Sequence, residues 1–281
     1  MKGYLKHSRG INIGTDLLAT TQEVAENHKT FEFQRMTDPS LPTIIVPARL
    51  NSSRFPRKLL ANLAGKPLVV RTAERIRQEA PEFDLFFAVD GDELSQVLTQ
   101  NGFHCVLTDP ALPSGTDRIA HANKQLLRKK VINVQADEPM VSRTHILSLA
   151  KALDQKGADL STLAVAFSRE IDFQDPNQVK VVRDNSGFAL YFSRSAIPYD
   201  RDGQGFMAAS SFKHLGLYAY KDSFLQKFLS SPQGTLEKLE KLEQLRALEM
   251  GCLISVGIVE EETKGVDIPE DLQALDNSSF F

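Results

Sequence analysis

The sequence predicts an α/β protein with a mostly parallel β-sheet that is covered by helices. From residue 43 onward, short β-branched or apolar segments alternate with segments whose apolar residues recur at helical spacing. The links between them are short, and neither a repeat nor a low-complexity linker interrupts the series. With 281 residues, of which 42% are hydrophobic, the chain is long enough for one large domain. Repeated strand–helix units of this kind build parallel sheets with helices on both faces.

The chain up to residue 167 is a regular series of strands, each followed by a helix. We expect strands at 43–46, 84–90, 104–108, 130–134 and 160–167. Helices are expected at 67–79, 92–101 and 115–127, and after Thr144. In the first of these helices, Leu68, Ala73 and Ile76 suit one buried face.

After residue 167 the rhythm changes to closely spaced strands. Segments 178–183, 187–192 and 214–220 indicate an antiparallel insertion at about 178–221, rather than another strand–helix unit. A leucine-rich helix is expected at 236–250, with Gly251 in place to end it. A strand at 253–259 and a helix from Pro269 complete the series.

Composition excludes several classes of protein. A formal net charge of −3 gives no reason to expect a nucleic-acid partner. No apolar run approaches the roughly 20 residues that cross a bilayer, so no membrane partner is expected. Two cysteines, Cys105 and Cys252, are too few for a disulfide framework or a structural zinc site, which favours a cytoplasmic location. Residues 1–40 are polar, unlike a secretory signal, and we interpret them as an N-terminal extension of unassigned role before a domain at 41–281.

Four cations follow the first predicted strand, namely Arg49, Arg54, Arg57 and Lys58. In α/β proteins, ligands bind in the crevice beyond the carboxyl ends of the strands. The loop is therefore placed to bind a polyphosphate. For this cluster alone, a basic turn exposed to solvent is the alternative.

Two acidic motifs also follow predicted strands. Asp137 and Glu138 come after the strand at 130–134, and Asp267 comes after the strand at 253–259. Adjacent side chains point to opposite sides of an extended backbone, so we expect Asp137 to face the crevice and Glu138 to face structural partners. Mg²⁺ is held by one or two carboxylates with substrate phosphates and water, and this pair would suffice if the sheet order brings the two strand ends together. Taken singly, each motif could instead be a helix cap or a salt-bridged turn.

A further signal is the sequence Ser114-Gly115-Thr116 at the start of a predicted helix. Exposed amides at a helix N-terminus can bind an anion or read a base edge. Alone, this signal is more often an ordinary helix start.

Ordered motifs connect these sites along the chain. They lie at 45–49, 53–56 with Lys58, 65–67, 114–118, 133–135, 137–139, 191–194, 197–198, 214–216 with Tyr218, 242–246, 265–267 and 269–271. From about residue 43 to 275, this series resembles the 3-deoxy-manno-octulosonate cytidylyltransferases, also called CMP-Kdo synthetases. The resemblance implies a three-layer, Rossmann-like nucleotidyltransferase fold, with a homodimer formed through the antiparallel insertion.

The resemblance also implies a reaction. In that family, CMP is transferred from CTP to the anomeric hydroxyl of 3-deoxy-D-manno-octulosonate (Kdo), and pyrophosphate is released. The reaction uses Mg²⁺ and serves lipopolysaccharide biosynthesis. The implied partners of this chain are therefore CTP, Kdo and a second copy of itself.

Each matching residue takes its role from the resemblance. The implied catalytic residues are Arg49, Lys58, Asp137 and Asp267, of which Asp137 and Asp267 are also the implied metal ligands. The implied CTP-binding residues are Arg49, Arg54, Lys58, Ser114, Gly115 and Arg118. The implied sugar-binding residues are Gln135, Arg194, His214, Tyr218, Glu243 and Gln244. These residue types suit a sugar acid, because Arg can bind a carboxylate through two parallel hydrogen bonds and Glu and Gln can hydrogen-bond to hydroxyls. Helical spacing further predicts one shared face for Glu240, Glu243, Gln244 and Ala247.

Three positions depart from the family pattern. Arg57 and Ala136 stand where the family usually has glycine, and Val89 stands where relatives tend to have threonine. Arginine resists loop conformations that glycine allows, which puts the path of the triphosphate loop in question.

Two alternative functions stay open. The first is a cytidylyltransferase for another acid sugar, such as 8-amino-Kdo or a sialic acid, and the segment at 200–212 would decide this choice. The second is a nucleotide-binding module without turnover. The presence of both Asp137 and Asp267 argues against such a module.

Overall fold

The fold is built around one sheet. Its strands are β1 (Thr43–Ala48), β4 (Leu85–Val89), β5 (His104–Leu107), β6 (Lys130–Asn133), β7 (Leu160–Ala166), β8 (Lys180–Arg183), β9 (Ala189–Ser193), β10 (Phe212–Lys221) and β11 (Ile254–Val259). The computed structural model describes residues 38, 40–51, 54–202 and 210–277. The predicted extension at 1–40 therefore lies outside the described residues apart from Asp38 and Ser40, as does most of the segment at 200–212. All described residues belong to one compact unit, Thr37–Phe281.

Most strands of the sheet run parallel. The order across the sheet is β11-β7-β10-β6-β1-β4-β5, and β8 joins β9 to the side of β10. β1 pairs in parallel with β4 on one side and with β6 on the other, and β11 pairs in parallel with β7. β10 is antiparallel to both of its neighbours, β6 and β7. This confirms the predicted fold class.

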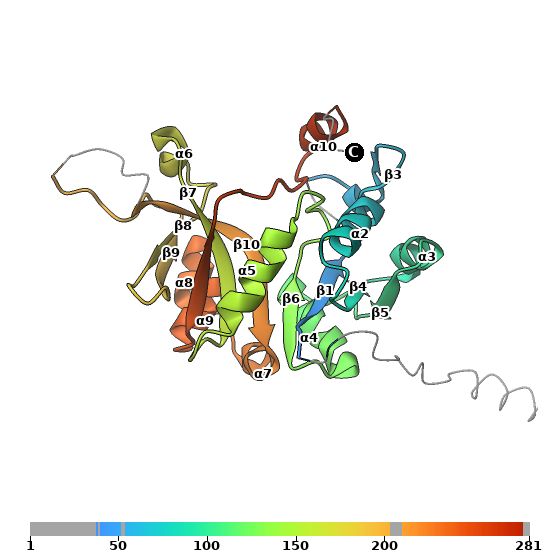
Figure 1. Ribbon diagram of the computed structural model, residues 1–281, viewed down its shortest axis with the longest axis horizontal. Coiled ribbons are helices and arrows are strands. Elements are labelled where there is room, and N and C mark those ends of the chain that lie inside the picture. The colour runs from blue at the N-terminus through green and yellow to red at the C-terminus, as the bar shows by residue number, and fades with distance from the viewer. Residues whose placement is uncertain (1–37, 39, 52–53, 203–209, 278–281) are drawn as a thin grey trace, which may run out of the picture. The chain divides into compact units, whose positions relative to one another are not determined.

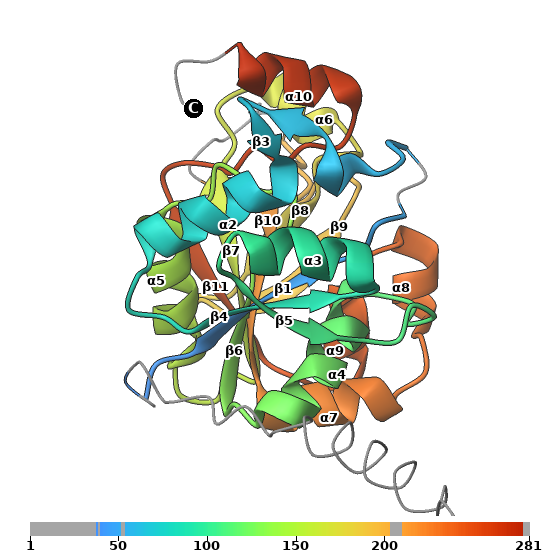
Figure 2. The same cartoon turned by 90° about the vertical axis from the view of Figure 1, so that its right-hand side faces the viewer.

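Helices cover both faces of the sheet. One face carries α2 (Leu68–Glu79), α3 (Asp92–Gln100) and α5 (Arg143–Leu153), and the other carries α4 (Gly115–Leu126), α7 (Asp222–Ser230) and α9 (Gln244–Glu249). Figure 1 shows α5 against the sheet, and Figure 2 shows α2 and α3 on the side opposite to α4 and α9. The remaining elements are η1 (Lys58–Leu60), β2 (Asn62–Leu63), β3 (Lys66–Pro67), α6 (Glu170–Gln174), α8 (Thr235–Glu240) and α10 (Pro269–Asp276). No helix of the described residues is both long and apolar enough to span a membrane.

Alternation along the strands explains the two helical layers. In β1, Ile44 and Val46 pack into the core that lies beneath α2, α3 and α5, whereas Ile45 packs into the core on the opposite face. All three side chains are fully buried, because successive residues of a strand point to opposite faces and both faces are covered. Each such side chain contributes about 1.5–3 kcal/mol to folding.

The elements predicted up to residue 167 are all present, with ends that differ by only a few residues. One later strand was placed wrongly. The segment at 214–220 was predicted within the antiparallel insertion, but β10 lies inside the central sheet, and only Phe212 and Lys213 pair with β8. Leu215, Leu217 and Ala219 are buried, as a strand with neighbours on both sides requires.

The single helix predicted at 236–250 was also wrong. Two helices, α8 and α9, occupy this segment, and Lys241 between them has a left-handed backbone with φ 54°. Glu240 therefore turns away from Gln244, and its carboxylate accepts hydrogen bonds from Ser193 Oγ at 2.6 Å and from Arg194 N at 2.9 Å. Glu240 is therefore not on the predicted common face, whereas Glu243, Gln244 and Ala247 line one small cavity together.

Candidate active site

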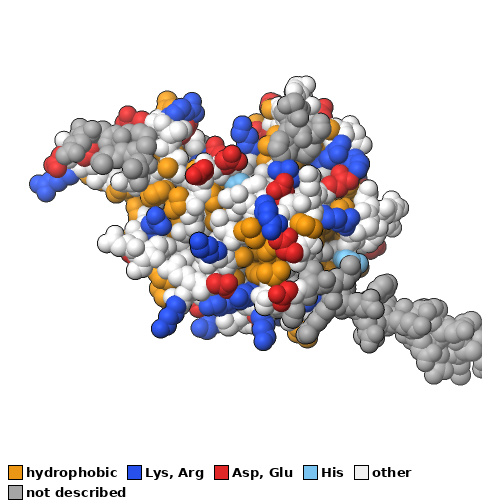
Figure 3. Space-filling model, in the orientation of Figure 1, with side chains coloured by type: hydrophobic (Ala, Val, Ile, Leu, Met, Phe, Trp, Pro, Cys, Tyr) orange, Lys and Arg blue, Asp and Glu red, His pale blue; other side chains and the backbone are white. Residues whose placement is uncertain are grey.

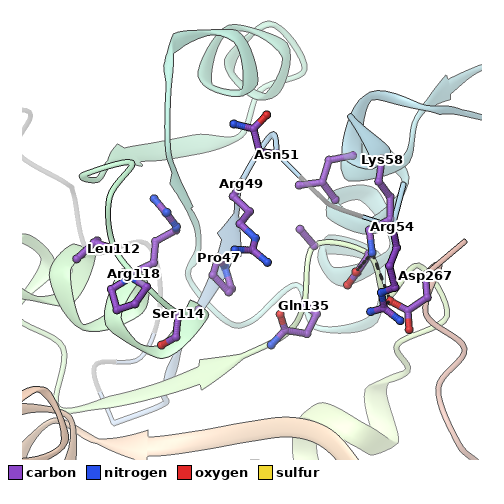
Figure 4. Close-up of a pocket in the computed structure, with 15 residues that line it drawn as sticks. Pro47, Arg49, Asn51, Arg54, Lys58, Leu112, Ser114, Arg118, Gln135 and Asp267 are labelled. Atoms are coloured by element: carbon purple, nitrogen blue, oxygen red, sulfur yellow. Dashed lines mark hydrogen bonds and ion pairs between the residues drawn. The ribbon is translucent and has the colours of Figure 1, made fainter. Parts of the chain in front are cut away.

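A cavity of about 430 Å³ opens at the carboxyl ends of β1 and β6 (Figure 4). The chain continues from β1 to β4 and β5 on one side and then returns to β6 on the other side of β1. Such a reversal of strand order leaves a crevice between the loops, which is where α/β proteins bind their ligands. The cavity is lined by Pro47, Arg49, Asn51, Arg54, Lys58, Leu59, Leu112, Pro113, Ser114, Gly115, Arg118, Gln135, Ala136, Asp137 and Asp267.

Cations from the loop after β1 line one wall of this cavity. Arg49 and Arg54 are exposed, whereas Lys58, at the start of η1, is 8% exposed. Leu50, in the same loop, donates its amide to both carboxylate oxygens of Asp90 at 3.1 Å each, which fixes the start of the loop beside β4. The loop therefore presents two long, exposed guanidinium groups, those of Arg49 and Arg54, and the buried ammonium of Lys58 to the cavity.

Two carboxylates converge on the buried ammonium. Lys58 Nζ lies 2.5 Å from Asp137 Oδ2 and 3.6 Å from Asp267 Oδ1. Arg54 Nη2 also donates to Asp267 Oδ1, at 2.8 Å, and Figure 4 shows Arg54, Lys58 and Asp267 pointing toward one another. Opposite charges are thus paired across the cavity where the sequence predicts a metal site.

The donor set fits a hard divalent cation that is completed by substrate. Asp137 and Asp267 supply carboxylate oxygens close enough to share one ammonium, so they could share one cation at the same place. Among the residues that the structure describes, no group of three or more His, Cys, Asp or Glu side chains could hold a metal ion. Phosphate oxygens and water would therefore have to provide the other ligands, as is usual for Mg²⁺.

The two acids come together, although the sheet order does not make the strands that precede them neighbours. β11, which precedes Asp267, is separated from β6 by β7 and β10. The chain instead crosses the end of the sheet over α5 on its way to α10 (Figure 1). Val266 N donates to the Asp137 carbonyl at 2.9 Å, and this bond docks the crossing chain beside the first acid.

Glu138 faces this crossing chain rather than the cavity. A Cβ atom on Gly265 would lie 3.0 Å from Glu138 Oε1, a contact so tight that the carboxylate would have to shift to admit a side chain there. Burial raises the pKa of Glu138 to about 7, and the neighbouring charges of Asp137 and Asp267 act in the same direction. A hydrogen bond from Thr263 and the charge of Lys58 oppose the rise. The carboxyl group is thus a structural partner of residues 263–265.

The start of α4 forms a second wall. Ser114 is the N-cap of α4, and its Oγ accepts from Asp117 N at 3.2 Å and bonds Asp117 Oδ2 at 2.6 Å. Arg118, buried one turn into the helix, donates to Thr108 Oγ1 at 2.5 Å and to the Asp109 carbonyl at 3.3 Å. Burial lowers the pKa of Arg118 from its usual value. The cavity is therefore lined by Ser114, Gly115 and Arg118 together. The family resemblance implies that all three bind CTP.

Of the predicted sugar-binding residues, only Gln135 lines this cavity. His214, Tyr218, Glu243 and Gln244 form a separate group, in which the rings of His214 and Tyr218 are 5.5 Å apart and Gln244 Nε2 is 3.5 Å from His214 Nδ1. Burial lowers the pKa of His214 to about 3, so this imidazole is neutral near pH 7.

Arg194 belongs to neither group. Its Nε donates to the Glu240 carbonyl at 2.7 Å, and its Nη1 donates to the Pro176 carbonyl at 3.1 Å. The guanidinium is thus engaged by backbone oxygens beside β8 and β9 and does not line the cavity.

A chain of hydrogen bonds links the cavity to the second group. Gln135 Nε2 donates to Asn133 Oδ1 at 3.1 Å, and Asn133 Nδ2 donates to Tyr220 Oη at 3.3 Å. Tyr220 Oη is 3.5 Å from Thr116 Oγ1, which in turn donates to the Glu243 carboxylate. Asn133 and Thr116 lie in motifs that the sequence reveals, but neither they nor Tyr220 were predicted as site residues. A polar Asn inside the apolar run 131–134 was the one signal that could have revealed this network.

This fold and site define a nucleotidyltransferase, in which a mostly parallel sheet carries basic loops and paired carboxylates at its switch point. A family model described as cytidylyltransferase matches residues 43–260, and the chain belongs to this family.

Individual relatives agree with this membership. The chain is 40% identical to a 3-deoxy-manno-octulosonate cytidylyltransferase of Thermodesulfovibrio yellowstonii, over 83% of this chain and 95% of the relative. It is 42% identical to an 8-amino-3,8-dideoxy-manno-octulosonate cytidylyltransferase of a Shewanella species, over 82% of this chain and 94% of the relative. A solved structure of CMP:2-keto-3-deoxy-manno-octonic acid synthetase complexed with CTP is 34% identical, with a TM-score of 0.79, and the match covers 84% of this chain and 97% of that one.

Proposed function

We propose that this protein transfers CMP from CTP to the anomeric hydroxyl of Kdo, with release of pyrophosphate. The observation that carries the proposal is the convergence of Asp137, Asp267 and Lys58 at a cavity that Arg49 and Arg54 also line. The likeness to the Kdo cytidylyltransferase of T. yellowstonii supports CTP and Kdo as the substrates.

In the proposed reaction, Arg49, Arg54 and Lys58 bind the triphosphate and offset its charge. The anomeric oxygen forms a bond to the α-phosphorus as the hydroxyl proton passes to solvent, and the bond from the α-phosphorus to the oxygen that bridges to the β-phosphate breaks. Pyrophosphate then carries away the electron pair of that bond. Fixed cations stabilise the charge that develops on the leaving group, and this is the main contribution of a protein to such transfers.

Asp137 and Asp267 would hold Mg²⁺ in this proposal. When bound, the ion supplies positive charge that orients and neutralises the α-phosphate. Lys58 and Arg54, which pair with the two acids in the structure, would then turn to phosphate oxygens. Exchange of one anionic partner for another keeps the buried ammonium of Lys58 paired throughout, which avoids the cost of an isolated buried charge.

On the sugar side, Gln135 is the residue that links the two groups of side chains. We propose that it contacts the sugar near the α-phosphate, and that His214, Tyr218, Glu243 and Gln244 recognise the hydroxyls further away. Neutral His214 suits this role, because an uncharged imidazole can donate at one nitrogen and accept at the other. Arg194 would have to leave its backbone partners to reach the sugar carboxylate.

The direct test is a pyrophosphate-release assay with CTP and a panel of acid sugars, with and without Mg²⁺. We expect release that depends on both Kdo and Mg²⁺. If 8-amino-Kdo were the only sugar turned over, the protein would instead have the activity named for the Shewanella relative. Binding of CTP without release of pyrophosphate with any sugar would overturn the proposal in favour of a module without turnover.

We further propose that the protein acts as a cytoplasmic homodimer in lipopolysaccharide biosynthesis. Both cysteines, Cys105 and Cys252, are free, as a reducing compartment allows. Leu190 on β9 and Tyr199 beyond it are 63% and 86% exposed, and such apolar surface favours burial against a partner. Light scattering should give twice the mass of the chain, and Leu190→Glu should shift it toward the monomer. A monomeric wild type would contradict the dimer.

A further inference from the structure

The segment that carries Asp267 has no regular structure of its own. Residues 260–268, here named the crossing segment, join β11 to α10 and contain neither helix nor strand. In the space-filling view, the surface is hollowed between the parts that carry α6 and α10, and acidic side chains lie along this hollow (Figure 3). Without a helix or a strand ladder, the position of Asp267 depends on individual contacts along the crossing segment.

His145 provides the contact nearest to β11. This residue lies in the first turn of α5 and is 2% exposed. Its Nδ1 accepts the backbone N–H of Ser142 at 3.1 Å, and its Nε2 lies 2.8 Å from the Glu261 carbonyl. A backbone N–H can only donate, so Nδ1 carries the lone pair and the proton is on Nε2. The neutral ring therefore donates to Glu261 and ties the crossing segment to α5.

Further contacts continue from Glu261 to the cavity. Lys213 pairs with Glu262, and Gly265 lies against the buried carboxyl of Glu138. Val266 N then donates to the Asp137 carbonyl at 2.9 Å. The Lys213–Glu262 pair is partly exposed, and pairs of that kind contribute little to holding a backbone. His145 is therefore the buried anchor at the β11 end of the crossing segment.

We infer that His145 is a positioning residue for Asp267, acting through the Glu261 carbonyl. This inference depends on the proposed function in one respect, which is that Asp267 takes part in the reaction. Loss of the bond should free the first half of the crossing segment. Val266, which is fully buried and donates to the Asp137 carbonyl, would then be the main remaining anchor, and Asp267 should be held less firmly beside Asp137 and Lys58. Residues that orient a metal ligand in this way typically change metal affinity or activity by about 10–100-fold when replaced.

Two conservative variants separate this role from simple capping of α5. His145→Gln keeps an N–H donor that can reach the Glu261 carbonyl, but it lacks the ring nitrogen that accepts from Ser142. His145→Asn keeps a short acceptor for the Ser142 N–H, but it cannot reach Glu261. Ser161→Ala is the matched control, because it removes a buried hydrogen bond of 2.9 Å to the Leu149 carbonyl of α5 without touching the crossing segment.

Limited trypsin digestion of the full chain measures detachment directly, because Lys264 is exposed in the middle of the crossing segment. We expect cleavage after Lys264 to be about 3- to 10-fold faster in His145→Ala and His145→Asn, the factor that one hydrogen bond provides. His145→Gln and Ser161→Ala should match the wild type. Wild-type rates in His145→Asn, equal rates in the Gln and Asn variants, or fast cleavage of Ser161→Ala would each overturn the inference.

The same variants are then compared in the pyrophosphate assay. His145→Asn should raise the Mg²⁺ concentration for half-maximal rate about tenfold and leave the KM for CTP unchanged, and His145→Gln should restore the wild-type value. An unchanged Mg²⁺ requirement in His145→Asn would show that the anchor does not position Asp267. If the wild type releases no pyrophosphate, the proposed function fails, while the digestion still decides whether His145 anchors the segment.

Discussion

At the scale of single residues, Arg57 combines a strained backbone with an ion pair. Its φ of 57° lies in the left-handed region, which a residue with a Cβ atom occupies at a cost. Its guanidinium bonds Glu93 on α3, with Nη1 3.2 Å from Oε2, and it does not line the cavity. This hydrogen bond raises the pKa of Arg57. Arg57 thus adopts a turn that glycine would allow and adds a tether from η1 to α3.

A double-mutant cycle should separate the strain from the ion pair. Arg57→Gly alone removes both, so we expect little change in Tm. In a Glu93→Gln background the ion pair is already lost, and Arg57→Gly should then raise Tm because only strain is relieved. Thermal unfolding of the four proteins measures this, with the KM for CTP as a control that should stay constant. A fall in Tm in both backgrounds would contradict the account.

His214 predicts a pH dependence of stability. Its pKa is about 3 in the fold and about 6.5 in an unfolded chain, so between these values the unfolded state binds a proton that the folded state excludes. Stability should therefore fall as pH falls below 6.5, by up to about 1.4 kcal/mol per pH unit. Urea unfolding at pH 7 and pH 5.5 should show a smaller loss in His214→Asn than in the wild type. Equal losses would mean that His214 titrates normally.

At the scale of elements, the break between α8 and α9 shows what periodicity can hide. The leucines of 236–250 recur at helical spacing, and no Gly or Pro marks an interruption. The break is set by tertiary contacts, because Arg246 reaches back to Glu237 through two buried hydrogen bonds of 2.6 and 2.7 Å. The same guanidinium packs 4.1 Å from the Phe228 ring centroid. A sequence pattern contains none of these long-range partners.

The break between α8 and α9 can be tested by whether one substitution raises or lowers the free energy of unfolding. Lys241→Gly should stabilise the protein, by up to about 1 kcal/mol, because glycine occupies the left-handed region without strain. In one continuous helix, the same change would cost about 1 kcal/mol. Lys238→Gly, inside α8 and exposed, is the control that should be destabilising by that amount. Urea denaturation compares the two, and equal losses would indicate a single helix.

At the scale of the whole molecule, the site depends on sheet order and on the crossing segment. Local patterns predicted β1, β4, β5, β6 and β7 and the helices α2 to α5, since each pattern reflects burial of that element alone. They could not predict that β10 enters the sheet or that β11 lies at its far edge, because strand order is decided by pairing across the chain. Asp137 and Asp267 were predicted as partners, but they meet through the crossing segment and not through adjacent strands.

The most direct measurement of the central claim is Kdo-dependent pyrophosphate release by Asp137→Asn beside the wild type at saturating Mg²⁺. A carboxamide is a poor Mg²⁺ ligand, so kcat should fall by about 100-fold or more. The amide oxygen still accepts from Lys58, so the variant should remain folded, which its thermal unfolding would verify. Wild-type turnover in folded Asp137→Asn would contradict the claim that Asp137, Asp267 and Lys58 form the reaction centre.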